Sequence, residues 1–250
     1  MKSLKENFQK AHIVIIGSGI IGKFNALELS ELGFRITIID PDEEKNSSNA
    51  ALGLLMGNMY QKRRGRSWDL RRQSIELWPK WIEFLKKFNY ELKIKKPLIQ
   101  LTTNEEKFKK LEKFVYESGN LNLQILKRDS IIISNINQAF QTKNIKGMIS
   151  FDDGRINAKS LLKTLDKYLK YKKINFVNEE IIKIRKANNQ WFSTTKNNGD
   201  IKSDIVILCN SLKAVDLIDG LSHNIKLKPV LGQAIEAVSY THLTLPTRAQ

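Results

Sequence analysis

The chain has 250 residues, enough for one large domain or two modest ones, and 41% of them are hydrophobic, as in ordinary globular proteins. No apolar run is long enough to span a bilayer, and residues 1–10 are too polar for a secretory signal, so we expect a cytoplasmic protein. The single cysteine, Cys209, excludes an internal disulfide and a cysteine-built metal site, and is expected to be a small buried hydrophobe.

The formal net charge of +16 would suit a nucleic acid or an anionic membrane surface. The charges are spread along the chain, however, and its many Lys, Asn and Ile residues have A/T-rich codons, so a biased genome also explains the composition. We therefore expect a solvated lysine-rich surface and no nucleic-acid partner. One local cluster keeps that alternative open, and its members are Lys62, Arg63, Arg64, Arg66, Arg71 and Arg72.

The first forty residues carry the pattern of a βαβ unit. An apolar run at residues 12–16 ends at Gly17, which is typical of a buried parallel strand. Residues 20–32 have the apolar positions of a buried helix, and Gly33 follows them where a helix-ending glycine belongs. Residues 34–39 are a second β-branched run, so strand, helix and strand follow one another within about 30 residues.

The rest of the chain alternates helical and strand patterns. Pro79 either starts a new helix or kinks the one that contains it. Asn157 stands where it would cap the start of a helix. Helices are predicted over residues 68–88, 105–116 and 157–169, and strands over residues 98–101, 174–185 (one or two), 191–195 and 205–208.

The strongest motif joins the first strand to the first helix. Its residues match G-x-G-x-x-G and are Gly17, Ser18, Gly19, Ile20, Ile21 and Gly22. An acidic residue, Asp40, ends the next strand about 20 residues later, as a dinucleotide-binding fingerprint requires.

Each glycine in this motif has a physical reason. Gly17 permits the tight turn, Gly19 lets a pyrophosphate approach the backbone, and Gly22 lets the helix pack close to the strand. The helix N-terminus then presents N–H groups to the phosphates. Asp40 accepts hydrogen bonds from the ribose hydroxyls and disfavours a 2′-phosphate. NAD and FAD both remain open on this motif alone.

Later segments resemble the family of FAD-dependent oxidoreductases that includes D-amino-acid oxidase and glycine oxidase. The small-residue segment 49–55 is similar to its second flavin contact region, in which the backbone lies against the ribityl chain and the isoalloxazine. Five further segments are similar to segments of the family in the same order along the chain, and they extend the resemblance to about residue 237. The further similar segments are 70–78, 153–162, 181–184, 204–207 and 228–233.

The resemblance implies FAD as the cofactor, an α/β fold and two domains. A Rossmann-type FAD-binding domain would comprise residues 1–60 and 151–225, and a mixed α+β substrate domain residues 61–150 and 226–237. The family usually has glycine where this chain has Ser211, which is a departure at a cofactor contact. Beyond the motif residues and Asp40, the implied FAD contacts are Asn49, Ala50, Ala51, Gly53, Leu54, Ile181 and Ser211.

The implied reaction oxidises the C–N bond of an amino acid or related amine by hydride transfer to flavin N5. No catalytic residue is assigned, because the family's carboxylate-binding arginine and tyrosine lie beyond the last strand present. Two alternatives stay open. One is oxidation of a tRNA wobble-uridine side chain, as in a related branch of the family, and the other is a non-catalytic dinucleotide-binding protein.

The end of the chain differs in amino-acid composition from the Lys-, Asn- and Ile-rich sequence before it. Residues 238–247, VSYTHLTLPT, correspond in order to the codons of a common transposase-type sequencing adapter. We therefore expect native sequence to stop near Ala237, residues 238–250 to be a non-native tail, and this product to lack catalytic activity.

Overall fold

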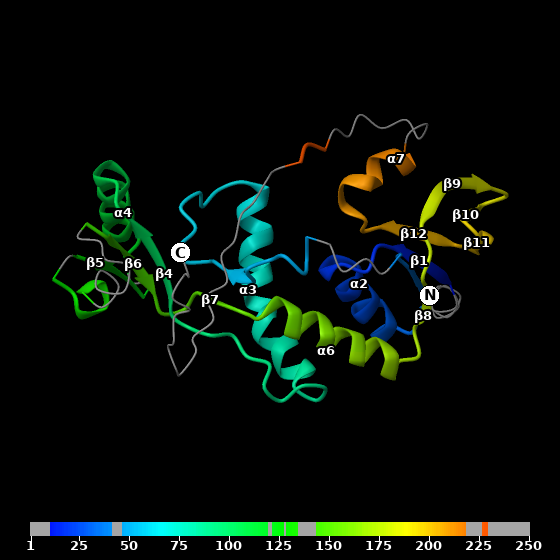
Figure 1. The fold of residues 1–250 in the computed structure, drawn as a ribbon, viewed down its shortest axis with the longest axis horizontal. Coiled ribbons are helices and arrows are strands. Elements are labelled where there is room, and N and C mark those ends of the chain that lie inside the picture. Colours follow the sequence, from blue (N-terminus) through cyan, green and yellow to red (C-terminus); the bar gives the residue numbers. More distant parts are fainter. Residues whose placement is uncertain are drawn as a thin grey trace, which may run out of the picture.

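The computed structural model describes residues 11–41, 47–119, 122–127, 129–134, 144–218 and 227–229. Figure 1 shows an elongated molecule in which two sheets lie at opposite ends, with the long helices α3 (Arg66–Leu85) and α6 (Ala158–Tyr171) between them. The expected tail, residues 238–250, lies outside the described residues.

A four-stranded parallel sheet forms one end of the molecule. Its order is β12-β1-β2-β8, so the chain runs outward from β1 in one direction and later returns on its other side. The strands are β1 (His12–Ile16), β2 (Arg35–Ile39), β8 (Asn175–Val177) and β12 (Ile205–Leu208).

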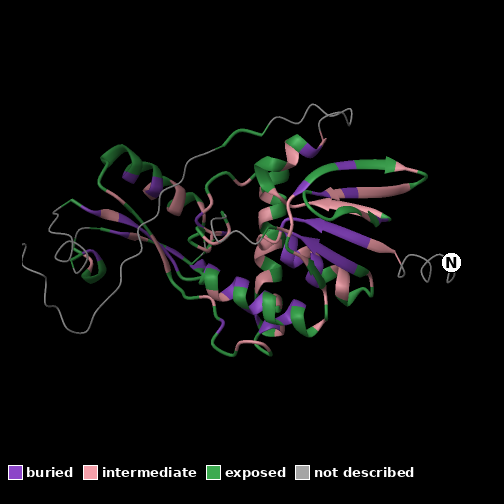
Figure 2. Cartoon of the chain, turned by 45° about the vertical axis from the view of Figure 1, so that its right-hand side comes forward, coloured by how far each residue is buried: buried purple, intermediate pink, exposed green. Residues whose placement is uncertain are grey.

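Both faces of this sheet are covered, which explains why its strands are continuous apolar runs. Ile13 and Ile15 of β1 belong to a core shared with α6 and with α2 (Ile20–Glu31). Val14 and Ile16, which alternate with them, belong to a core on the other face. Figure 2 shows long buried stretches in this sheet, and they belong to its two central strands, β1 and β2.

The second face is covered by an antiparallel sheet and a short helix. The sheet has the order β11-β10-β9, and it is a meander of neighbouring strands. Its strands and the helical segments that follow β12 are β9 (Ile181–Ala187), β10 (Gln190–Thr195), β11 (Gly199–Ser203), η1 (Ser211–Lys213) and α7 (Ala214–Ile218).

The other end of the molecule is an antiparallel sheet in the order β4-β6-β5, with α4 packed on it. Met59, Leu111, Leu123 and Met148 form the core between them. The strands β3 and β7 form a separate two-stranded antiparallel sheet, which pairs residues 54–55 with residues 154–155. These elements are β3 (Leu54–Leu55), β4 (Leu98–Thr102), α4 (Glu105–Glu117), β5 (Leu123–Leu126), β6 (Lys146–Ser150) and β7 (Gly154–Arg155).

The helix ends follow the local signals. Gly33 has φ 88° and donates its N–H to the Ser30 carbonyl, while Phe34 donates to Leu29, which closes the C-terminus of α2. Asn157 caps α6 by accepting the N–H of Ser160 at 2.9 Å. Pro79 neither starts a helix nor ends one, because α3 continues through it.

We propose that the two ends correspond to the expected domains. The parallel sheet and its covering elements come from segments before residue 42 and after residue 157, and the β4-β6-β5 sheet from the segment between them. Within the described residues, no helix is long and apolar enough to cross a membrane.

Candidate functional site

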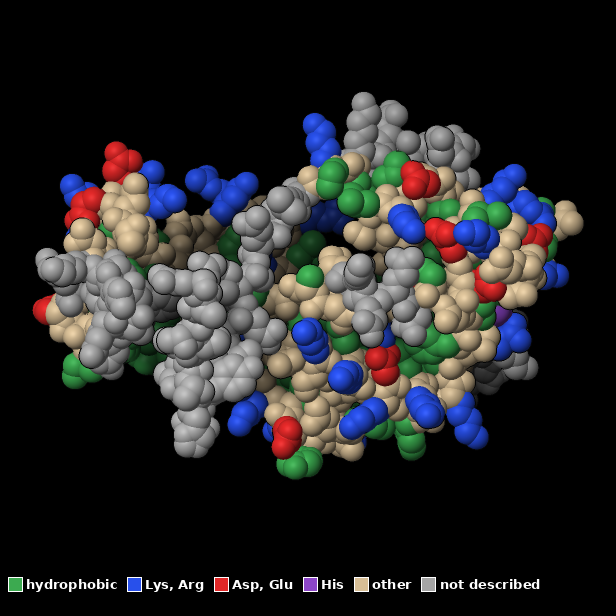
Figure 3. All heavy atoms as spheres, viewed as in Figure 1, with side chains coloured by type: hydrophobic (Ala, Val, Ile, Leu, Met, Phe, Trp, Pro, Cys, Tyr) green, Lys and Arg blue, Asp and Glu red, His purple; other side chains and the backbone are tan. Residues whose placement is uncertain are grey.

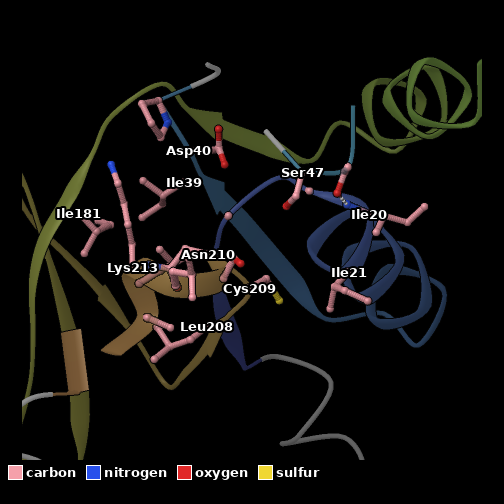
Figure 4. Close-up of a pocket in the computed structure, with 18 of the residues that line it drawn as sticks. Ile20, Ile21, Ile39, Asp40, Ser47, Ile181, Leu208, Cys209, Asn210 and Lys213 are labelled. Carbon is pink, nitrogen blue, oxygen red and sulfur yellow. Dashed lines mark hydrogen bonds between the residues drawn. The ribbon is translucent and has the colours of Figure 1, made fainter. Parts of the chain in front are cut away.

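A cavity of about 820 Å³ lies at the carboxyl ends of β1, β2 and β12. Because the chain leaves β1 on one side and returns on the other, loops diverge there and leave a crevice, which is where open α/β sheets bind ligands. Figure 4 shows Asp40, Ile181 and Lys213 facing this cavity from three different elements. Its size is within the usual range of small-molecule and cofactor sites.

The glycine loop at the cavity floor is shaped by close backbone contacts. Gly17 has φ 103°, and a Cβ there would lie 2.6 Å from the carbonyl oxygen of Cys209. A Cβ on Gly22 would lie 1.9 Å from the carbonyl oxygen of Gly17. Glycine at these two positions therefore allows β1, α2 and the end of β12 to approach one another.

The N-terminus of α2 opens onto the cavity. Its cap residue, Gly19, has no side chain to bond the helix, and the N–H of Ile20 donates instead to Ser48 Oγ at 2.9 Å. A Cβ on Gly19 would lie 3.0 Å from the same Ser48 oxygen. Ser47 and Ser48 both border the cavity. The sequence analysis did not single out either serine.

Asp40 holds the glycine loop as well as bordering the cavity. Its Oδ2 accepts the backbone N–H of Ser18 at 2.7 Å, and the N–H of Gly17 donates to the Ile39 carbonyl at 2.9 Å. The carboxylate therefore lies against the loop that it was expected to serve. A dinucleotide placed in the cavity would meet this acid beside the helix N-terminus.

The opposite wall is the turn that follows β12. Cys209 is half-buried there instead of fully buried, and burial raises the pKa of its thiol, so the thiol stays protonated at neutral pH. Asn210 Oδ1 is buried without a hydrogen-bond partner among the described residues. Lys213 Nζ donates to Glu180 Oε1 at 3.0 Å across the cavity rim, and this hydrogen bond lowers the pKa of Glu180.

Ser211 occupies this turn in a glycine-like conformation. Its φ is 55°, in the left-handed region that costs a residue with a Cβ about 1 kcal/mol or more. The backbone at this turn thus adopts a conformation that suits glycine, and it is strained because Ser211 has a Cβ.

The structure brings together only part of the expected contact set. Gly53 has φ 69°, and a Cβ there would lie 2.0 Å from the Ile156 carbonyl oxygen, so this glycine serves the packing of the chain against the segment after β7. Leu54 pairs with Arg155 between β3 and β7. Of the expected contacts, the cavity is lined by Gly17, Gly19, Ile20, Ile21, Asp40, Ala51, Ile181 and Ser211. The others, Ser18, Gly22, Asn49, Ala50, Gly53 and Leu54, are not among its lining residues.

The parallel sheet, the glycine loop and the cavity define a dinucleotide-binding protein. The chain matches the family model described as FAD dependent oxidoreductase, DAO, over residues 12–248. It therefore belongs to that family, and FAD is the family's cofactor. A comparison with curated protein sequences gives no significant match.

Solved structures show the same fold. The chain is similar to glycine oxidase from Bacillus cereus, with a TM-score of 0.70 and 20% identity over 85% of this chain and 60% of that one. Glycine oxidase from Geobacillus kaustophilus gives 0.70 and 21% over 85% and 59%. L-Amino acid deaminase from Proteus myxofaciens gives 0.69 and 18% over 87% and 49%. The chain thus spans about three fifths of the length of the glycine oxidases.

The residues present fit the nucleotide part of FAD. Gly19 itself contributes no side chain at the α2 N-terminus, where the Ser48 hydroxyl accepts the N–H of Ile20, and a helix N-terminus beside the cavity suits a pyrophosphate. Asp40 offers a carboxylate at the end of β2, which suits ribose hydroxyls. Ile181 presents an apolar side chain from β9, which suits a flat base.

Proposed function

We propose that this protein oxidises the C–N bond of an amino acid or a related amine with FAD as the cofactor. The observation that carries the proposal is the cavity at the α2 N-terminus, bordered by Gly17, Gly19 and Asp40, in a chain that belongs to the FAD-dependent oxidoreductase family. The names of the similar structures, glycine oxidase and L-amino acid deaminase, support the substrate class.

In this proposal the chain's own residues bind and orient the cofactor. The pyrophosphate would be taken by those N–H groups of the glycine loop and of α2 that do not donate to the Ile39 carbonyl, Asp40 or Ser48, with the Ser48 hydroxyl beside them. Asp40 would accept the ribose hydroxyls while it keeps the Ser18 N–H in place. Ile181 and the backbone at Ser211 would border the rest of the cofactor. When bound, the flavin supplies the acceptor for a hydride from the substrate carbon.

The cofactor site is tested by flavin binding. The purified protein, reconstituted with FAD and desalted, should keep the visible absorption bands of bound flavin. Gly19→Leu should lose them, because a side chain at this position would lie against Ser48 at the α2 N-terminus, where the pyrophosphate is proposed to bind. Ala187→Leu, at the far end of β9, is the control for added bulk and should keep its flavin. Retention of flavin by Gly19→Leu would show that the site is elsewhere.

The reaction is tested on the FAD-loaded protein expressed to the natural stop codon of its gene, under anaerobic conditions. A panel of amino acids and N-methylated amino acids should include one that bleaches the flavin absorption and yields the corresponding keto acid or aldehyde. Bleaching by none of them would contradict amine oxidation by this chain and leave the dinucleotide site as a binding function.

A further inference from the structure

A second cavity, of about 450 Å³, lies at the opposite end of the parallel sheet from the proposed cofactor site. The neighbouring parallel strands β1, β2 and β8 begin there, and their first residues are His12, Arg35 and Asn175. The cavity is also lined by Lys172 and Lys173, which follow the end of α6 and precede β8. Figure 1 shows α6 leading into β8 at this edge of the sheet.

Four side chains at this edge lie on the same face of the sheet. His12 is in register with Arg35, and Thr37 with Asn175, so the members of each pair point the same way. Arg35 and Thr37 are two residues apart on β2, which places all four on one face. The contacts agree, because Thr37 Oγ1 lies 2.9 Å from His12 Nε2 and accepts the Asn175 amide at 3.4 Å. Polar groups from three strands therefore converge on this cavity.

The charged residues that line the cavity are all basic. They are Arg35, Lys172 and Lys173, and no Asp or Glu is among the lining residues. Three other cavities in the described part of the chain each have at least one acidic residue in their lining. A hollow lined by one sign of charge focuses its field and attracts counter-ions more strongly than scattered surface charges do.

Two of these three cations are not balanced by an acid. Lys172 donates to Glu31 at 2.8 Å, whereas Arg35 and Lys173 form no ion pair within the described residues. A further acid close by, Asp204, accepts a backbone N–H of β1 at 2.7 Å and does not line the cavity. Helix α6 ends beside the cavity, but its C-terminal dipole amounts to only about half a negative charge. An excess of positive charge therefore remains.

The available donors suit a phosphate group. The Arg35 guanidinium can bind two phosphate oxygens at once, and the Lys173 ammonium acts as a second, compact charge. The Asn175 amide has another N–H besides the one that Thr37 accepts. Two unpaired cations match the charge of a phosphate dianion. The cavity is within the size range of small-molecule sites and leaves room for the rest of a phosphorylated molecule.

We propose that this cavity binds a small molecule that carries a phosphate group, held by Arg35, Lys173 and the amide of Asn175. The site is independent of the proposed function, because it lies at the amino ends of the strands and the cofactor cavity lies at their carboxyl ends. Failure of flavin binding or of amine oxidation would therefore not affect it.

His12 can report whether an anion is bound. Burial lowers the pKa of His12 and the charge of Arg35 lowers it further, whereas the Lys202 carbonyl and the Asp204 carboxylate oppose these effects. An anion bound at Arg35 should offset the guanidinium charge and raise the pKa of His12 again.

NMR titration of the purified 250-residue chain tests the site. The chain has three histidines, so His223→Gln and His242→Gln leave His12 as the only source of imidazole signals. Inorganic phosphate and glycerol 3-phosphate are the probes, and potassium chloride at matched ionic strength is the control. We expect a saturable shift of the His12 signals with a dissociation constant of about 1 mM or lower for either probe. The pKa of His12 should be higher in saturating phosphate than in chloride.

Three variants compare affinities, whatever the size of the shift. Arg35→Gln and Lys173→Gln should each weaken phosphate binding about tenfold, because a charged donor to the dianion is lost. Lys163→Gln removes an exposed lysine from the middle of α6 and changes the net charge equally, so its affinity should be unchanged.

The site is overturned if phosphate and chloride shift His12 alike, or if Arg35→Gln and Lys163→Gln bind phosphate equally well. If Arg35→Gln does not fold, the exposed Lys173→Gln decides by the same comparison. Binding of inorganic phosphate without glycerol 3-phosphate would overturn the assignment to a phosphorylated molecule. Binding of tRNA or of anionic lipid vesicles, with no response to either probe, would assign these charges to a macromolecular surface instead.

Discussion

Asp40 combines two roles that substitutions can separate. Asp40→Asn keeps an oxygen that can accept the Ser18 N–H but removes the charge, whereas Asp40→Ala removes both. We expect both variants to bind FAD more weakly, Asp40→Ala by about 1–3 kcal/mol, because a charged hydrogen-bond acceptor is lost. Quenching of FAD fluorescence on binding measures the affinity. Asp200→Asn, on the exposed strand β11, is the control, and equal FAD affinity in all variants would exclude Asp40 from the site.

The backbone conformation of Ser211 favours glycine, so glycine at this position should stabilise the protein. Its φ of 55° suits glycine, so Ser211→Gly should be more stable than Ser211→Ala by about 1 kcal/mol, because alanine keeps the Cβ that causes the strain. Urea unfolding, followed by tryptophan fluorescence, compares the two variants. The glycine variant should also bind FAD more tightly than the native serine does. Equal stabilities would mean that the turn does not hold Ser211 in the left-handed region.

The turn before β7 organises a loop that is distant from it in sequence. The Asp153 carboxylate accepts three backbone N–H groups from residues 57–59, and few other acceptors could replace it in a buried position. Asp153→Asn should therefore lower the free energy of unfolding by about 2 kcal/mol or more, since hydrogen bonds to a charge are lost. Denaturant unfolding measures the loss.

The neighbouring acid provides a matched control. Asp152 is exposed, and within the described residues it accepts hydrogen bonds from two side-chain amides, those of Asn58 at 3.2 Å and Asn122 at 2.9 Å. Asp152→Asn should change the stability by less than about 1 kcal/mol. If the two variants lose equal stability, the loop is held by contacts other than the Asp153 carboxylate.

The distribution of charge over the molecule argues against a nucleic-acid site. Figure 3 shows Lys and Arg side chains scattered over the visible face. Part of the basic cluster is used internally: Arg63 donates to the Asn58 and Tyr60 carbonyls, and burial lowers the pKa of its guanidinium. Arg71 is held by Met56 and Tyr60 in the same way.

We therefore expect no tRNA binding of micromolar or tighter affinity at physiological salt, and a filter-binding assay measures it. Three basic residues of the cluster, Lys62, Arg64 and Arg66, are exposed and form no ion pair within the described residues. Micromolar binding that is lost in the Arg64→Gln, Arg66→Gln double variant and weakens steeply with salt would favour the tRNA alternative.

Much of the fold could be predicted because its signals are local. The apolar runs 12–16 and 205–208 coincide with β1 and β12, since a strand covered on both faces needs no alternation. Gly33 and Asn157 marked helix ends because capping depends on one residue and its immediate neighbours. The family was also recognisable, because the order of such segments along the chain is itself a one-dimensional signal.

The tertiary structure decided what depends on contacts between distant segments. Gly53 was expected at the cofactor, but its missing side chain makes room for Ile156, about a hundred residues later. The Ser48 hydroxyl at the α2 N-terminus, the burial of Asn210 Oδ1 and the three bonds to Asp153 likewise arise from separate segments meeting in space. Such pairings leave no periodic or local trace in the sequence, because hydrogen bonding and burial are set by the fold as a whole.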